Sequence, residues 1–180
     1  TGKEIKAPKA FLNNMPKDIV LDGELCAGRG KFNLTSSIVR KTKDVEKYTE
    51  DWINKITYHV FDSPSDMIFE FRMSFLNDKI GTKYNNVSIV YQNEINNNTC
   101  IDTELKKIIT LGGEGLMLRK NGSMYEHKRS KSLLKVKQFH DMEVKIVGYK
   151  NGTGKYKGMV GSFDCETRLG KKFNCGSGLS

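Results

Sequence analysis

The chain has 180 residues, a length that suits one ordinary domain or one domain with part of a second. Lysine and arginine total 30 against 21 aspartate and glutamate residues, which gives a formal net charge of +9. This excess of positive charge favours an anionic partner, most simply nucleic acid. A basic surface without any such partner would have the same composition, so charge alone does not decide between them.

The compartment is indicated by what the sequence does not contain. No segment approaches the roughly 20 apolar residues of a membrane span, and no signal peptide opens the chain. The cysteines are too scattered for a zinc knuckle and are expected to be free thiols in a reducing compartment. They are Cys26, Cys100, Cys165 and Cys175. We therefore expect an intracellular protein (cytoplasm, nucleus, organelle or viral factory) that does not enter a membrane.

Strand and helix patterns alternate along the first three quarters of the chain. Strands are expected over residues 18–26, 56–62, 86–92, 115–120 and 132–137, and helices over 43–56, 65–81 and 102–113. The second helix should bury one stripe, formed by Ile68, Phe71, Phe75 and Leu76. The third should be capped by Asp102 or Thr103, after an asparagine-rich polar loop. Because no regular strand–helix–strand repeat occurs, the pattern predicts an α+β fold of mainly antiparallel sheets flanked by helices.

The pattern changes near residue 140. Short alternating segments broken by glycine follow, without a helical period, which is typical of a small β-barrel. We expect a first domain over residues 1–139 and the start of a second domain over residues 140–180. The opening on Thr1–Gly2 and the close on a glycine-rich turn predict a fragment cut at both ends.

Two pairs of charged residues occupy alternate positions in predicted strands. Asp22 and Glu24 are two apart, as are Lys135 and Lys137, so each pair should share one face of its strand. Two lysines on one face can clamp a phosphate, but they can also be a solvated strand edge. The Asp-Gly-Glu sequence can likewise be a tight turn with exposed acids. Each pattern alone leaves both interpretations open.

Taken together, these residues suit phosphoryl or nucleotidyl transfer. Such chemistry needs cations around the reacting phosphorus and carboxylates to hold a divalent metal, usually Mg²⁺. Asp22, Glu24 and Glu114 could supply the carboxylates. Phe61 ends an apolar strand, immediately before Asp62, and an aromatic ring there is either part of the core or a surface for stacking a purine.

Four segments carry a resemblance in their order along the chain. They are "LDGEL", "YHVFD", "EGLMLR" and "LLKVK", and in that order they resemble motifs III, IIIa, IV and V of the ATP-dependent DNA ligases. This family belongs to the covalent nucleotidyltransferase superfamily. The opening "TGKEIKAPKAF" resembles the segment after the first ligase motif, and "VGYKNGTGKYKGMVGSF" resembles the start of the ligase OB-fold domain.

The resemblance implies a role for each matched residue. Phe61 would stack on the adenine of ATP, and Glu24 would contact the ribose or organise the site. Glu114, with Asp22, would hold Mg²⁺, while Lys135 and Lys137 would bind the α-phosphate. The reaction implied is the sealing of nicks in duplex DNA through enzyme–AMP and DNA–adenylate intermediates. The first domain would be the adenylation domain and the second the beginning of an OB-fold.

The sequence departs from the family pattern at the nucleophile. The family uses the lysine of a K-x-D-G motif, whereas Val20 stands two residues before the only Asp-Gly, at Asp22. An arginine before the Thr-Gly step and the C-terminal motif VI are also missing. As written, the chain is expected not to adenylate itself. The alternatives are a non-catalytic basic nucleic-acid-binding module, that is, a degenerate ligase, and an RNA ligase or capping-type nucleotidyltransferase.

Two basic segments are the expected contacts to DNA. They are residues 119–132 and residues 149–158, the latter with Lys150, Lys155 and Lys157. Lysines in such loops can contact phosphates and so position a duplex without reading its sequence, although solvated loop lysines look the same. The expected partner is nicked duplex DNA, bound by a monomer.

Overall fold

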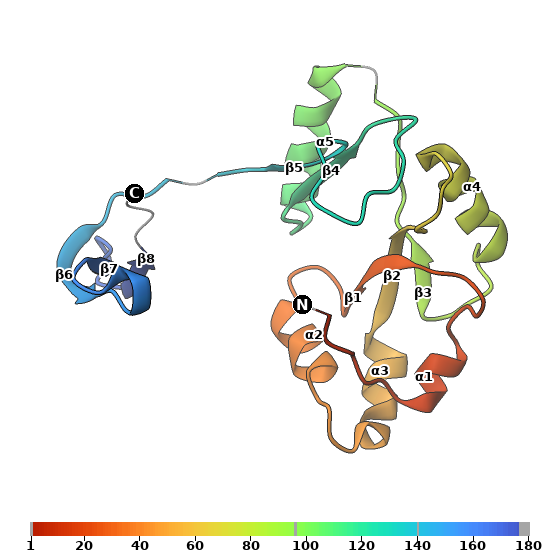
Figure 1. The fold of residues 1–180 in the computed structure, drawn as a ribbon, viewed down its shortest axis with the longest axis horizontal. Coiled ribbons are helices and arrows are strands. Elements are labelled where there is room, and N and C mark those ends of the chain that lie inside the picture. Colours follow the sequence, from red (N-terminus) through yellow and green to blue (C-terminus); the bar gives the residue numbers. More distant parts are fainter. Residues whose placement is uncertain (1, 96, 140, 177–180) are drawn as a thin grey trace. The chain divides into compact units, whose positions relative to one another are not determined.

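The chain folds into two compact units (Figure 1), and the computed structural model describes residues 2–95, 97–139 and 141–176 of it. The first unit is Thr1–Gln138 and the second is Phe139–Ser180. The elements of the first unit are α1 (Lys9–Asn13), β1 (Asp22–Cys26), α2 (Phe32–Val39), η1 (Val45–Tyr48), α3 (Thr49–Lys55), β2 (Thr57–Asp62), α4 (Phe69–Lys79), β3 (Val87–Ile89), α5 (Asn98–Thr110), β4 (Gly115–Arg119) and β5 (Leu133–Lys137). Those of the second are β6 (Lys145–Asn151), η2 (Gly154–Tyr156), β7 (Val160–Glu166) and β8 (Lys172–Gly176).

The strands form separate sheets rather than one continuous sheet. In the first unit, β1 pairs with β2 in antiparallel fashion and β2 with β3 in parallel, while β4 and β5 form an antiparallel sheet of their own. In the second unit, β6, β7 and β8 form an antiparallel meander. The predicted α+β class with mainly antiparallel sheets is confirmed. All the expected strands of the first unit form, although β1 and β3 are shorter than their patterns.

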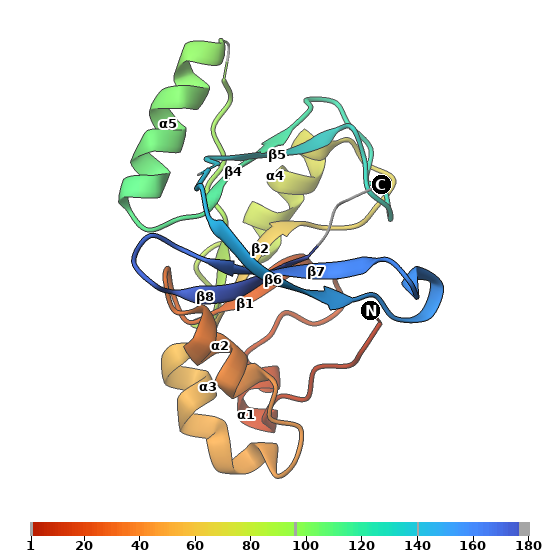
Figure 2. The same ribbon diagram turned by 90° about the vertical axis from the view of Figure 1, so that its left-hand side faces the viewer.

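Two apolar clusters hold the first sheet of the first unit in place. Phe11, Ile38, Trp52 and Ile56 form one cluster among α1, α2 and α3, and the rings of Phe11 and Trp52 meet edge to face with their centroids 4.9 Å apart. The other cluster joins α4 to β2 and β3 and comprises Val60, Leu76, Ile80 and Val87. Figures 1 and 2 show α5 alongside β4, away from α1, α2 and α3.

The buried face of α4 differs from the predicted stripe. Phe69, Arg72 and Leu76 are buried, whereas Phe71, which the periodicity placed in the core, is 62% exposed. The reason is Arg72, which is fully buried because its guanidinium group pairs with a carboxylate inside the unit. Apolar periodicity cannot anticipate a helix that turns a charged side chain inward. The predicted stripe is therefore confirmed at Leu76, which is fully buried, and wrong at Phe71. The helix also begins at Phe69, later than its pattern.

The start of α5 also differs from its prediction. The helix begins at Asn98, within the asparagine-rich segment that was expected to be a loop, and its cap is Asn97 rather than Asp102 or Thr103. The side-chain oxygen of Asn97 accepts a hydrogen bond from the backbone N–H of Cys100 at 3.1 Å. Because asparagine caps helices as well as aspartate does, a run of asparagines contains several possible start points.

The cysteines bear out a simpler expectation. All four cysteines are free thiols, and of these Cys165 is buried in β7. Across the part of the chain that is described, none of the helices has the length and apolar character needed to cross a bilayer. Two short helices, α1 and α2, were not predicted, and both contribute a side chain to the first apolar cluster.

Candidate functional site

The β4–β5 hairpin brings together residues from two separate motifs. Its register pairs Met117 with Lys135 and Gly115 with Lys137. Glu114 stands just before β4, and its Oε2 lies 3.5 Å from Lys135 Nζ. The Glu114 side chain is 80% exposed and that of Lys135 48% exposed, and Lys137 is also exposed. Two cations and a carboxylate are thus available to an incoming ligand at this edge of the hairpin.

Gly115 permits the close approach of the two strands at this edge. Its φ is +154°, and a Cβ atom added there would lie 2.2 Å from the Val136 carbonyl oxygen. Alanine at this position would push β4 away from β5, because the obstructing atom belongs to the backbone. The spacing between Glu114 and the two lysines depends on this glycine.

We expect Gly115→Ala to lower the free energy of unfolding of the first unit by about 1–3 kcal/mol through strain and overpacking. Urea unfolding followed by the fluorescence of Trp52, the single tryptophan, measures the change. Gly122→Ala in the same hairpin is the matched control, since Gly122 has φ +67° with no atom within 4 Å of the added Cβ. It should show only the cost of its backbone conformation, about 1 kcal/mol. Equal losses in the two variants would argue against the close approach as the cause.

The remaining residues of the predicted site lie on the first sheet. Asp22 and Glu24 are both in β1, but the register shifts between Asp22 and Gly23, so strict alternation does not carry across that step. Glu24 is exposed opposite His59, and Asp22 is half-buried opposite Asp62. Phe61 is half-buried in β2, and its carbonyl oxygen accepts a hydrogen bond from Gln92. That Asp22, Glu24 and Phe61 form one site with the hairpin lysines stays a prediction.

A metal ion would have to be held by few protein ligands. Across residues 2–95, 97–139 and 141–176, no three histidine, cysteine, aspartate or glutamate side chains gather as a metal cage. Mg²⁺ commonly binds through one or two carboxylates together with phosphate oxygens and water. The exposed carboxylate of Glu114 fits that type of site, whereas one oxygen of Asp22 already accepts a hydrogen bond from Tyr125.

A buried ion cluster joins the hairpin to the first sheet. Asp62 in β2 is fully buried, and its carboxylate accepts from Arg72 at 2.6 Å and 3.1 Å. Arg119 at the end of β4 reaches the same carboxylate at 2.8 Å and is 13% exposed. Both guanidinium groups also lie over the Phe69 ring, at 5.6 Å for Arg72 and 5.0 Å for Arg119. One carboxylate is thus shared by two guanidinium groups.

Tyr125 extends this cluster to β1. Its hydroxyl donates to Asp22 Oδ2 at 2.7 Å, and its ring lies 5.7 Å from the Arg72 guanidinium carbon. Burial, together with the hydrogen bond to Asp22 and the charges of Asp22 and Asp62, raises the pKa of Tyr125 to about 12. The phenol therefore keeps its proton, and remains a donor, throughout the neutral range.

Sequence reasoning missed this cluster, although two signals for it exist. Arg72 is the single charged residue between apolar neighbours in "FRMSF", and Asp62 directly follows an apolar strand. A charge surrounded by apolar residues is often a buried charge with a partner. Spacing could not identify the complete cluster, because Arg119 and Tyr125 come from a distant part of the chain and the hydrogen bond between Tyr125 and Asp22 spans 103 positions.

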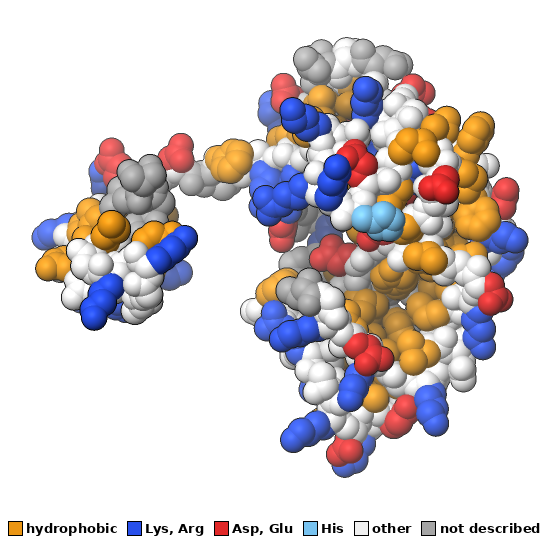
Figure 3. Space-filling model, viewed as in Figure 1, with side chains coloured by type: hydrophobic (Ala, Val, Ile, Leu, Met, Phe, Trp, Pro, Cys, Tyr) orange, Lys and Arg blue, Asp and Glu red, His pale blue; other side chains and the backbone are white. Residues whose placement is uncertain are grey.

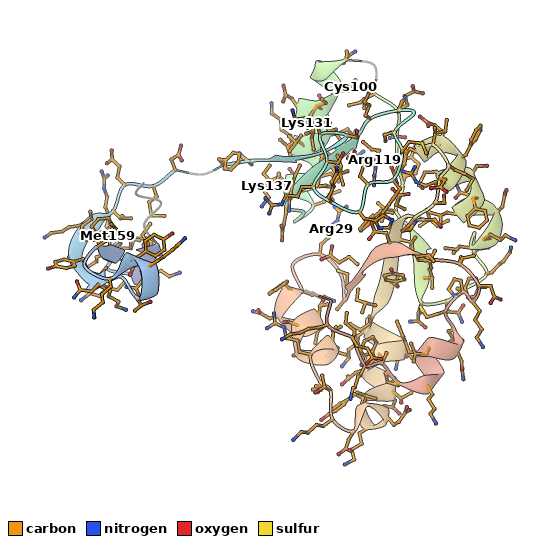
Figure 4. The ribbon with its side chains drawn as sticks, in the orientation of Figure 1. Arg29, Cys100, Arg119, Lys131, Lys137 and Met159 are labelled. Carbon is orange, nitrogen blue, oxygen red and sulfur yellow. The ribbon has the colours of Figure 1, made fainter. Side chains whose placement is uncertain are left out.

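Exposed cations lie on both units. Figure 3 shows Lys and Arg side chains over the part of the first unit that holds α5, β4 and β5, and Figure 4 shows Lys131 and Lys137 on that side, with Arg119 further inside. In the second unit, Lys150 Nζ lies 3.1 Å from Asn174 Oδ1 and 3.9 Å from Asp164 Oδ1. Lys155 lies over the Tyr156 ring at 4.8 Å, and Lys157 is exposed. Lys150 is thus partly engaged within its own sheet.

Models of two protein families match this chain. The ATP dependent DNA ligase domain matches residues 2–137, which include all the elements of the first unit. The DNA ligase OB-like domain matches residues 151–180. The chain therefore belongs to the ATP-dependent DNA ligase family.

Individual relatives agree with this membership. The DNA ligase of Haemophilus influenzae is 28% identical over 184 aligned residues, which cover 99% of this chain and 65% of that enzyme. The DNA ligase of enterobacteria phage T4 is 34% identical over 113 residues, covering 62% of this chain and 23% of that enzyme. This chain thus spans less than two thirds of the length of either relative.

Solved structures share the fold. A structure described as "DNA binding with a minimal scaffold: Structure-function analysis of Lig E DNA ligases" superposes with a TM-score of 0.86 and 36% identity, over 99% of this chain and 69% of that one. A second, named Pmar-Lig_PreS3, has a TM-score of 0.81 and 24% identity over 99% of this chain and 46% of that one. The second likeness concerns the fold alone.

Proposed function

We propose that this chain forms the ATP-binding core of a DNA ligase that seals nicks in duplex DNA through enzyme–AMP and DNA–adenylate intermediates. The observation that carries the proposal is the hairpin edge, where Glu114 lies 3.5 Å from Lys135 and Lys137 stands across from Gly115. Cations and a carboxylate at one exposed edge suit the binding of a nucleoside triphosphate and its metal ion. Residues 1–139 would be the adenylation domain, and residues 140–180 the start of an OB-fold.

Each residue has a proposed part in binding ATP. Lys135 and Lys137 bind the α-phosphate, Phe61 stacks on the adenine, and Glu24 contacts the ribose. Glu114, with Asp22 as a second carboxylate, would hold Mg²⁺. When bound, the metal would neutralise phosphate charge as it develops. Lys135 must leave Glu114 to reach a phosphate, and their exposed pairing, of the kind worth little in water, allows this.

The duplex would be held by the exposed cations of both units. Lys150, Lys155 and Lys157 of the second unit, with the basic segment between β4 and β5, are proposed to contact backbone phosphates. Such contacts position a duplex without reading its bases, which suits an enzyme that acts on nicks of any sequence. The protein is proposed to act as an intracellular monomer.

The presence or absence of a lysine nucleophile distinguishes the proposed ligase from a binding module without catalysis. The 180 residues contain no K-x-D-G, so we propose that they do not adenylate themselves. Together with the exposed cations, the same observation favours the alternative of a basic nucleic-acid-binding module without catalysis. An RNA ligase or capping-type enzyme would share the nucleotide site but differ in the acceptor strand.

Intact-mass spectrometry after incubation with ATP and Mg²⁺ tests the proposal. The chain as printed should gain no mass, whereas the chain with a K-x-D-G-bearing segment joined ahead of Thr1 should gain one AMP and then seal nicked DNA. The same fusion with alanine in place of the motif lysine is the control. A folded fusion that gains no AMP would contradict the proposal and favour the binding module. Sealing of nicked RNA but not DNA would favour the RNA ligase.

A further inference from the structure

The position of the β4–β5 hairpin is set by side chains rather than by a backbone ladder. The hairpin and the β1–β2–β3 sheet are separate sheets in the described structure. If the proposed function holds, Lys135 and Lys137 stand on the hairpin, while Glu24 and Phe61 stand on the other sheet. A nucleotide that contacts both groups requires their relative position to be defined to a fraction of an ångström. The side chains that join the two sheets therefore matter for binding.

Two of the side-chain contacts between the sheets involve residues that lie opposite each other, Asp22 and Asp62. The register pairs Asp22 of β1 directly with Asp62 of β2. Like charges at directly opposed positions repel each other, so each carboxylate needs a donor of its own. Arg119 from β4 reaches Asp62 at 2.8 Å, and Tyr125 from the segment after β4 reaches Asp22 at 2.7 Å. Side chains of the hairpin and its connecting segment thus bind both members of the cross-strand pair Asp22–Asp62.

The same segment is tied to α4 at two further points. The backbone N–H of Gly122 donates to both carboxylate oxygens of Glu70, at 2.8 Å and 3.1 Å. Arg72 donates to the Ser123 carbonyl oxygen at 3.0 Å. These ties hold the segment against α4 but do not reach β1. Among the ties described here, only the phenol of Tyr125 reaches β1.

The charges around Asp62 also favour a neutral hydrogen-bond donor at the position of Tyr125. Arg72 and Arg119 bring two positive charges to one buried carboxylate, Asp62. Asp22 is the next carboxylate, and the Tyr125 ring lies beside it and within 5.7 Å of the Arg72 guanidinium carbon. A neutral donor holds Asp22 near this excess positive charge without adding to it. Phenylalanine would fill the same space but leave Asp22 without this donor.

We propose that Tyr125 is a positioning residue for nucleotide binding. Its hydrogen bond to Asp22 holds the β4–β5 hairpin, and with it Lys135 and Lys137, in a fixed position relative to β1. The inference rests on the proposed ATP site for its functional consequence, but its structural part stands without it. With the hydroxyl removed, none of the contacts named here reaches β1, so the hairpin is held less firmly beside that strand.

Tyr125→Phe in the 180-residue chain tests the inference. Tyr58→Phe is the matched control, because it also removes a half-buried phenol hydrogen bond, from Tyr58 to the Leu21 carbonyl oxygen at 3.1 Å, but one that lies outside the hairpin. Hydrogen exchange of the β4 and β5 amides, which needs no ATP, should be faster in Tyr125→Phe by on the order of 10-fold. Tyr58→Phe should leave these amides as in the wild type.

Titration with ATP and Mg²⁺ provides the functional readout. Tyr125→Phe should bind ATP on the order of 10-fold more weakly, and Tyr58→Phe as the wild type does. Unchanged exchange and unchanged affinity in Tyr125→Phe would overturn the inference, as would equal effects in the two variants. If the wild type binds no ATP, the proposed site fails, and with it the role in nucleotide binding, while the exchange rates still decide whether Tyr125 holds the hairpin. Should Tyr125→Phe unfold, hydrogen exchange of the β4 and β5 amides in Asp22→Asn takes its place, with a smaller change expected in the same direction; unchanged exchange in that variant would overturn the inference.

Discussion

Asp62→Asn is expected to destabilise the first unit by about 3–5 kcal/mol, because it leaves buried charges uncompensated. The native carboxylate is fully buried and neutralises Arg72 and Arg119, which approach it at 2.6 Å and 2.8 Å. Asparagine has the same shape but no charge, so two guanidinium groups would face each other without an anion between them. The loss of stability should extend over the first unit, because the cluster joins β2, α4 and β4.

Urea unfolding monitored by Trp52 fluorescence measures this loss, because Trp52 is fully buried in the first unit. Asp44→Asn is the matched control: Asp44 pairs with Lys47 at 3.1 Å, but both side chains are at least 70% exposed. Removing this exposed pair should change little. If the midpoint of Asp62→Asn moved no further than that of Asp44→Asn, the buried cluster would not be a determinant of stability.

Lys135→Ala and Lys137→Ala are expected to have the largest effects on function. If each lysine stabilises charge on the α-phosphate in the transition state, each variant should lower the adenylation rate of the chain joined to a K-x-D-G segment by about 10²-fold or more. ATP binding by the chain as printed should weaken by on the order of 10-fold for each, as expected for loss of a hydrogen bond to a charged group. Lys135 has to exchange Glu114 for the phosphate, whereas Lys137 has no such pairing among the described ion pairs.

The adenylation rate is measured by transfer of labelled AMP in a single turnover, and the affinity by calorimetric titration. Lys107→Ala is the control for the change in net charge, because Lys107 is an exposed residue of α5 whose Nζ lies 3.7 Å from Glu104. It should behave as the wild type. Near-normal rates in both Lys135→Ala and Lys137→Ala would remove the phosphate clamp from the proposal.

Several features of the fold follow from local pattern, and the sequence predicted them. The pattern of residues 132–137 predicted a strand, and β5 forms there. The helix expected over residues 65–81 forms as α4, which ends at Lys79. Free cysteines and the α+β class are also confirmed. Each of these depends on neighbours within a few positions along the chain, which is the range over which backbone preference and side-chain periodicity act.

The order of four short motifs, from "LDGEL" to "LLKVK", was enough to indicate the ATP-dependent DNA ligase family, and that membership is shown by the family models. Local pattern failed where a distant residue decided the outcome. Arg72 is buried in the interior of the unit, where it pairs with Asp62, whereas Phe71 of the predicted stripe is exposed. The buried face of α4 therefore contains a charged side chain that apolar periodicity did not predict.

The sequence by itself determined the strands of the first unit and its helices α3, α4 and α5, although not α1 and α2, and it determined which residue types are available for binding a nucleotide. Only the tertiary structure decided that Asp22 and Asp62 stand opposite each other and that Tyr125 and Arg119 reach them from the hairpin. The physical reason is range: backbone preferences act between near neighbours, whereas a buried charge selects its partner by distance in space. Residues 103 positions apart along the chain can therefore be in direct contact in the folded unit.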